Sequence, residues 1–188
     1  MKIRYIIYFV VCLFILSACS EKHPSNNKID SFSFINQHEK PFGTEDLKGE
    51  IWVVSFIFTN CQTVCPPMMF EMASLQKKLM EKGLKVEFVS FTVDPDLDSP
   101  VVLKEYLKQF TSTETNWHML SGYSQETIEK FAREQFQTIV QKTNTSNQVI
   151  HGTNFYLIDK QGYIINEYNY TDESYVEEII KGIKKIDK

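Results

Sequence analysis

Apolar residues along the chain alternate between short continuous runs and longer stretches with helical spacing. Residues 51–58 form a near-continuous run of β-branched and aromatic side chains, which is typical of a central strand buried on both faces. Residues 66–82 carry apolar side chains at helical spacing, begin with proline and stop at Gly83, so they predict a helix. Residues 86–93 repeat the first pattern and predict a second buried strand.

The second half of the chain continues this alternation. The pattern predicts a helix at 100–110, a strand at 117–120, a helix at 125–134, strands at 136–141, 154–159 and 163–168, and a final helix that opens at Thr171. The last two strands are joined by a turn at 160–162 and form a hairpin. This order is typical of an α/β fold, a thioredoxin-like three-layer sandwich with an N-terminal β extension and an inserted β-hairpin.

The first residues read as a lipoprotein signal peptide that covers 1–18. Lys2 and Arg4 precede an apolar run at 6–16 that is too short to span a bilayer, and Leu-Ser-Ala follows directly before Cys19. Cys19 would carry the lipid, and Cys12 would be removed with the signal. A plain secretory signal and an uncleaved anchor are the alternatives. We therefore expect a lipid-anchored protein on the extracytoplasmic face of the cell membrane.

Residues 19–30 are polar and read as a tether, and residues 31–188 read as one domain. A domain of this size buries roughly 70% of the surface that its unfolded chain exposes, so it needs no disulfide for stability. The formal net charge is −4 and no basic tract is present, which argues against nucleic acid as a partner.

Cys61 and Cys65 are the candidate chemical centre. They lie between a predicted strand and a predicted helix, and their spacing is one residue longer than in ordinary dithiol oxidoreductases. A disulfide between them would close a very short loop and would constrain the unfolded chain little, so a purely structural bridge is a poor interpretation. Thiolates at a helix N-terminus are favoured and bind soft ions such as Cu(I), and one imidazole would complete a trigonal site.

Only one of the four histidines is placed to supply that imidazole. His23 lies in the tether, His38 in a predicted turn and His118 within a short strand. His151 directly precedes the strand at 154–159, and in thioredoxin-like folds this segment faces the cysteine turn. Dithiol enzymes carry a cis-proline there, whereas this chain has no proline after Pro100. From the residues alone, His151 is either a ligand or a solvated loop histidine.

Acidic and sulfur-containing residues near the cysteine pair have separate predicted roles. Asp94 ends a strand whose carboxyl end should lie beside the cysteine turn, so we expect it near the metal without binding it. Asp98 is predicted to cap the helix that begins at Pro100. The methionines at helical spacing after the pair are predicted to be core residues rather than copper contacts: Met68, Met69 and Met72.

Several motifs together resemble the Sco (SenC/PrrC) family of cytochrome oxidase assembly proteins. They are Phe-Thr-Asn-Cys-Gln-Thr-Val-Cys-Pro at 58–66, Met-Ala-Ser-Leu-Gln at 72–76, Thr-Val-Asp-Pro-Asp-Leu-Asp-Ser-Pro at 92–100, Trp-His-Met-Leu-Ser-Gly at 117–122, and His151. The resemblance implies a thioredoxin-like fold that binds one copper ion through Cys61, Cys65 and His151. It also implies a role in building the copper A centre of cytochrome c oxidase subunit II. The chain departs from the family at Ile150, where an acidic residue is common.

Two classes of function follow. A copper chaperone would hold the metal at an exposed site of low coordination and pass it to a partner, the copper A domain of subunit II. A thiol–disulfide oxidoreductase would use Cys61 and Cys65 to reduce a partner disulfide and would be recharged by an outside reductant. A thiol peroxidase is a poor interpretation because its pattern needs Thr or Ser three residues before the reactive cysteine, where this chain has Phe58 and Gln62.

Overall fold

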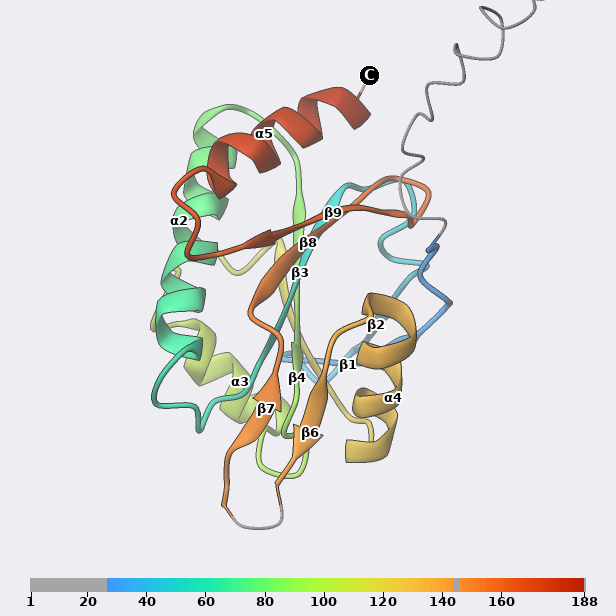
Figure 1. Cartoon of the computed structure of the whole chain (residues 1–188), viewed down its shortest axis with the longest axis vertical. Helices are drawn as coiled ribbons and strands as arrows, with labels where there is room; N and C mark the ends of the chain where they lie inside the picture. The colour runs from blue at the N-terminus through green and yellow to red at the C-terminus, as the bar shows by residue number, and fades with distance from the viewer. Residues whose placement is uncertain (1–26, 144–145, 188) are drawn as a thin grey trace, which may run out of the picture.

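A mixed β-sheet flanked by helices forms the centre of the protein (Figure 1). The computed structural model describes residues 27–143 and 146–187. The elements in chain order are β1 (Ser33–Asn36), β2 (Pro41–Gly43), β3 (Trp52–Ile57), α2 (Cys65–Glu81), β4 (Glu87–Thr92), α3 (Pro100–Leu107), β5 (Trp117–Ser121), α4 (Gln125–Phe136), β6 (Val140–Lys142), β7 (Val149–His151), β8 (Asn154–Ile158), β9 (Ile164–Asn169) and α5 (Tyr175–Ile186).

The strand predicted to be central is at the middle of the main sheet. Over the described residues the strand order is β2-β1-β5-β4-β3-β8-β9, with β3 parallel to β4 and antiparallel to β8. All six residues of β3 are buried, as are all but the first residue of β4. The prediction of two strands buried on both faces is therefore confirmed, because helices cover both sides of the sheet.

The helices form two outer layers. In Figure 1, α2, α3 and α5 lie on one face of the sheet, and α4 lies on the other. The first group is held together by ring packing of Phe70 on Phe110 and by a hydrogen bond from the hydroxyl of Tyr175 to the Glu71 carbonyl. On the other face, Phe136 of α4 packs edge-on against Phe56 of β3. The three-layer, thioredoxin-like α/β sandwich is confirmed.

The folded domain begins earlier than the sequence predicts. Lys28 forms a β-bridge with Tyr163, and the Ile29 amide donates to the carbonyl of Gly162 at 2.9 Å. Ile29 is also buried in the core. Residues 27–30, assigned to the tether from the sequence, therefore pack on the domain through backbone hydrogen bonds and the buried Ile29 side chain. The N-terminal β extension is present as the β1–β2 hairpin, which joins the sheet through β5.

The predicted strand at 136–141 was also misplaced. Helix α4 continues to Phe136, whose ring packs in the core, and Gln137 then ends the helix in the left-handed conformation with φ 52°. The strand that follows is β6, and it pairs antiparallel with β7 rather than with the main sheet. This β6–β7 hairpin is an inserted element at the lower end of Figure 1, the same end as the loop that leads into α2.

Some predictions concern residues outside the described part. Cys12, Cys19 and His23 all precede residue 27, so the signal peptide and the lipid anchor remain predictions. Among the described helices, none has the length and apolar character needed to cross a bilayer.

Candidate metal centre

The two cysteines lie where the central strand passes into the first helix of the sandwich. Cys61 belongs to the loop after β3, and Cys65 is the first residue of α2, followed by Pro66 within its first turn. Proline fits this position because the first helical amide has no intrahelical partner. Both cysteines are buried and both thiols are free. The loop therefore presents two sulfur atoms at the carboxyl end of β3, as the sequence predicts.

A sulfur atom takes the place of a capping group at the start of α2. Val64 is the N-cap residue and its side chain makes no capping hydrogen bond. The backbone amide of Cys65 instead donates to the Sγ atom of Cys61 at 3.3 Å. The first turn carries no acidic residue, so the positive end of the helix acts on the sulfur. This arrangement favours a thiolate at Cys61.

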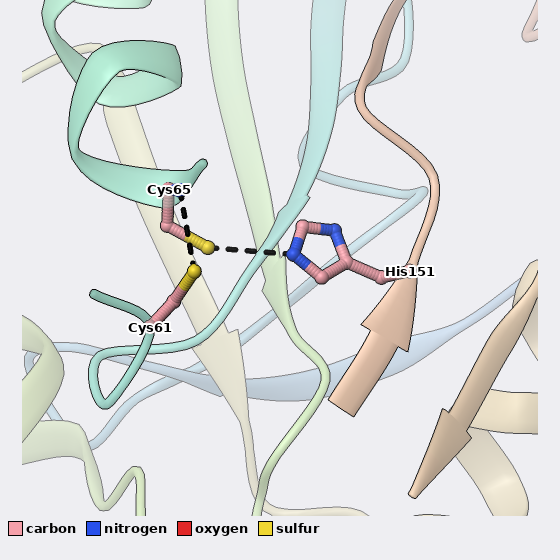
Figure 2. Close-up of side chains that lie close together, drawn as sticks. All are labelled: Cys61, Cys65 and His151. Carbon is pink, nitrogen blue, oxygen red and sulfur yellow. Dashed lines mark hydrogen bonds between the residues drawn. The ribbon is translucent and has the colours of Figure 1, made fainter. Parts of the chain in front are cut away.

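His151 reaches the cysteine pair from the β6–β7 hairpin. Figure 2 shows its ring pointing at the sulfur atoms, with the Nε2 atom 3.4 Å from Sγ of Cys65. The ligand atoms of Cys61, Cys65 and His151 all lie within 4.8 Å of one another. The ring is held edge-on against Phe58, with centroids 5.7 Å apart. The structure therefore brings together the three residues that the resemblance implies.

The second ring nitrogen of His151 fixes which tautomer faces the sulfur atoms. Its Nδ1 atom lies 2.8 Å from the carbonyl oxygen of Gly152. A carbonyl oxygen only accepts, so Nδ1 carries the proton in this hydrogen bond and Nε2 presents its lone pair. A neutral imidazole with a free Nε2 is the form that binds metal ions.

The two thiols have opposite protonation preferences. The hydrogen bond from the Cys65 side chain, together with the bond from the amide of Cys65, lowers the pKa of Cys61 from 9.0 to about 3, although burial opposes this. The same hydrogen bond and burial raise the pKa of Cys65 above its ordinary value. The pair therefore holds one proton, on Cys65, and one negative charge, on Cys61.

This donor set suits a soft metal ion. Two sulfur ligands and one imidazole match the preferences of Cu(I), and three ligands leave room for a fourth group from outside. Both cysteines are buried whereas His151 is only half-buried, so the imidazole side of the site is its more exposed side. Zinc sites of the structural kind need four protein ligands, and the described residues around the pair supply three.

Asp98 does not cap α3, so this prediction was wrong. The N-cap is Ser99, whose side chain accepts from the amide of Val102. Asp98 is fully buried and accepts hydrogen bonds from the amide and hydroxyl of Thr59 and from the hydroxyl of Thr92. Its charge also contributes to raising the pKa of Cys65. Asp98 therefore ties the start of the cysteine loop to the end of β4.

Asp94 is buried just after β4, and its Oδ1 atom accepts a hydrogen bond from Nζ of Lys142 at 2.7 Å. Lys142 lies at the end of β6, in the hairpin that carries His151. The influence of Asp94 on the metal remains a prediction. Sequence reasoning missed Lys142, because nothing in a lone lysine within a short polar strand indicates a buried partner.

The other histidines and methionines considered from the sequence have the surroundings of ordinary structural or surface residues. His118 stacks on Phe42 with ring centroids 3.8 Å apart, and its Nε2 atom lies 2.9 Å from the carboxylate of Glu87. His38 is exposed in the turn between β1 and β2. The three methionines of α2 are buried in the core, which agrees with their predicted role: Met68, Met69 and Met72.

Comparison with known proteins gives one consistent result. The family model described as SCO1/SenC matches residues 20–187. The crystal structure of a SCO1/SenC family lipoprotein from Bacillus anthracis is 50% identical, with a TM-score of 0.86 over 89% of this chain and 99% of that one.

Two further structures extend this comparison. BsSco, a member of the Sco family of cytochrome c oxidase assembly proteins in which a disulfide switch was identified, is 42% identical, with a TM-score of 0.80 over 88% of this chain and 96% of that one. Arabidopsis thaliana ScoI with copper bound is 26% identical, with a TM-score of 0.71 over 83% and 98% of the two chains.

Proposed function

The chain belongs to the SCO1/SenC family, and we propose that it is a copper-binding assembly factor for cytochrome c oxidase. It delivers copper to the copper A site of subunit II, or it prepares the thiols of that site. The observation that carries this proposal is the convergence of Cys61, Cys65 and His151, whose ligand atoms lie within 4.8 Å of one another. One copper ion per chain is bound there.

The open side of the site supports transfer rather than permanent storage. The imidazole of His151 is half-buried, and its neighbour Ile150 is half-exposed, whereas both sulfur atoms are covered. A thiolate from a partner reaches the metal first from the imidazole side. Such a ligand displaces His151 before it displaces either cysteine, so the metal is never without soft ligands during transfer.

The proposed location is the extracytoplasmic face of the cell membrane, with Cys19 as the lipidated residue. The related protein from Bacillus anthracis is a lipoprotein, which supports this location. An anchored protein shares the membrane with its client, and the search for that client is then confined to two dimensions. The copper donor and the thiol reductant are separate molecules, and the residues of this chain do not identify them.

A second candidate function is reduction of a partner disulfide. The lowered pKa of Cys61 favours this activity, because a thiolate is the attacking species in thiol–disulfide exchange. Cys61 would attack the partner and Cys65, whose amide already contacts the Cys61 sulfur, would resolve the mixed disulfide. A disulfide between Cys61 and Cys65 would be the product, and a reductant would then restore both thiols.

Copper titration of the full chain in detergent tests the metal site. The wild-type protein should bind one copper per chain and show a charge-transfer band from thiolate to Cu(II). His151→Ala should weaken both the band and the affinity by about 10-fold to 100-fold. His38→Ala is the matched control, because His38 is exposed and distant in sequence from the site. Equal binding by all three proteins would remove His151 from the site.

Cells that lack the protein separate the two functions. Excess copper should restore cytochrome c oxidase activity if delivery of the metal is the main role. Restoration by a small thiol reductant, without added copper, would make disulfide reduction the main role instead.

A further inference from the structure

His151 is carried by an element that is separate from the main sheet. In the described part of the chain, β6 and β7 pair only with each other. Val140 pairs with His151, and Lys142 pairs with Val149 at the other end of the same short ladder. The position of the imidazole therefore depends on how the β6–β7 hairpin is fixed to the rest of the domain.

Lys142 makes a charged contact between this hairpin and the core. Its ammonium group lies 2.7 Å from Oδ1 of Asp94 and 2.9 Å from Oδ2 of Asp96. Only 1% of the Asp94 side chain is exposed, whereas 65% of the Asp96 side chain is exposed. Water screens the outer pair, so the inner pair with Asp94 carries most of the attraction.

Asp94 depends on Lys142 as much as the hairpin does. Among the described residues its second oxygen, Oδ2, is buried without a hydrogen-bond partner. A buried carboxylate with one charged partner is costly to leave alone, so removal of that partner favours a rearrangement around it. Asp94 lies two residues after the end of β4, and its amide is held by the hydroxyl of Thr92, which fixes the core side of the contact.

The hairpin also buries Val140 and Val149 in the core, but its other polar contacts do not replace this pair. The amide of Lys142 donates to the carboxylate of Glu129 on α4 at 3.0 Å. The side-chain amide of Gln148 reaches the carbonyl of Asn60, in the cysteine loop, at a long 3.4 Å. Both bonds restrain the hairpin, but neither places a charge against a buried opposite charge.

We propose that Lys142 and Asp94 are positioning residues that hold the β6–β7 hairpin, and with it His151, against the cysteine pair. This inference rests on the proposed copper site and assigns to Asp94 a role exerted through Lys142. The ion pair restrains the end of the ladder opposite His151, so the imidazole reaches the sulfur atoms already oriented.

Two variants and one control test the proposal. Lys142→Met keeps the length of the side chain and removes its charge, and Asp94→Asn keeps the shape and removes the buried charge. Asp96→Asn removes only the exposed partner and is the matched control. Each change is made in the full chain in detergent, alone and in a His151→Ala background, and Lys142→Arg tests whether charge alone is sufficient.

Copper titration gives the first readout. Lys142→Met and Asp94→Asn should each lower the Cu(II) affinity by about 10-fold and weaken the charge-transfer band, while Asp96→Asn and Lys142→Arg should resemble the wild type. In the His151→Ala background the same changes should have no further effect, because the residue they position is gone. Full additivity with His151→Ala would overturn the proposal.

Hydrogen exchange of the copper-free protein gives a second readout that does not depend on the metal. The amides of β6 and β7 should exchange faster in Lys142→Met and Asp94→Asn than in Asp96→Asn, and the amides of β3 should be unchanged. Equal exchange in all variants would overturn the inference. Failure of the wild-type chain to bind copper would instead overturn the proposed function, and the exchange experiment would still decide whether Lys142 holds the hairpin.

Discussion

Nε2 of His151 lies 3.4 Å from Sγ of Cys65, although 86 positions separate the two residues along the chain. The contact belongs to a cluster in which the ligand atoms of Cys61, Cys65 and His151 all lie within 4.8 Å of one another. The two cysteines of this cluster have opposite protonation preferences, and the first two predictions follow from that difference.

The reduced chain should contain one thiolate at neutral pH. Because the pKa of Cys61 is lowered from 9.0 to about 3, its thiolate persists as the pH falls and is lost only near pH 3. The ultraviolet absorbance of the thiolate measures this directly, and Cys61→Ser should abolish it. Loss of the absorbance well above pH 3, while circular dichroism still reports a folded chain, would contradict the assignment.

Copper binding at neutral pH should release one proton from the cysteine pair for each metal ion. Cys65 keeps its proton in the metal-free chain because the hydrogen bond to Cys61 and burial raise its pKa, whereas Cys61 is already ionised. A metal ion requires both sulfur atoms as thiolates. Calorimetry of copper binding in buffers with different ionisation enthalpies counts the protons. Release of two would show that both thiols are protonated beforehand.

Asp98→Ala should destabilise the domain more than Ser99→Ala. Removal of the buried carboxylate leaves the amide of Thr59 and the hydroxyls of Thr59 and Thr92 without their acceptor, at a cost of about 3 kcal/mol. Ser99→Ala removes only a helix cap, worth about 1 kcal/mol. Urea denaturation of the two variants gives both free energies of unfolding. Equal losses would show that the contacts of Asp98 with Thr59 and Thr92 stabilise the domain no more than a helix cap does.

Gly152→Ala should weaken copper binding without a cysteine or histidine being changed. A Cβ atom at this position would overlap the Oγ1 atom of Thr138, and the Gly152 carbonyl is the acceptor for Nδ1 of His151. Relief of the overlap by movement of Gly152 would turn the imidazole away from the sulfur atoms. Copper titration should show a loss of about 10-fold, and the double variant Thr138→Ala/Gly152→Ala should recover most of it. If the double variant did not recover copper affinity, the loss in Gly152→Ala would not come from overlap with Thr138.

Local sequence patterns were sufficient to predict the strand, loop and helix that carry the cysteine pair. The apolar run that became β3 and the proline after Cys65 indicate a strand that passes into a helix, and these signals depend only on residues near each other in sequence. They placed both cysteines at the carboxyl end of a central strand. They did not separate Asp98 from Ser99 as the cap of α3, because both precede Pro100 and both residue types cap helices.

The sequence by itself determined the alternation of strands and helices, the position of the cysteine pair, and, through a resemblance, the histidine opposite it. Only the tertiary structure decided that Nε2 of His151 faces Cys65, that Asp98 binds Thr59, and that Asp94 is paired with Lys142. The physical reason is the range of the interactions. Hydrophobic periodicity and helix start signals act over a few residues, whereas each of these contacts joins residues at least 39 positions apart. Packing of the sheet and its helices brings such residues together, and no local pattern carries that information.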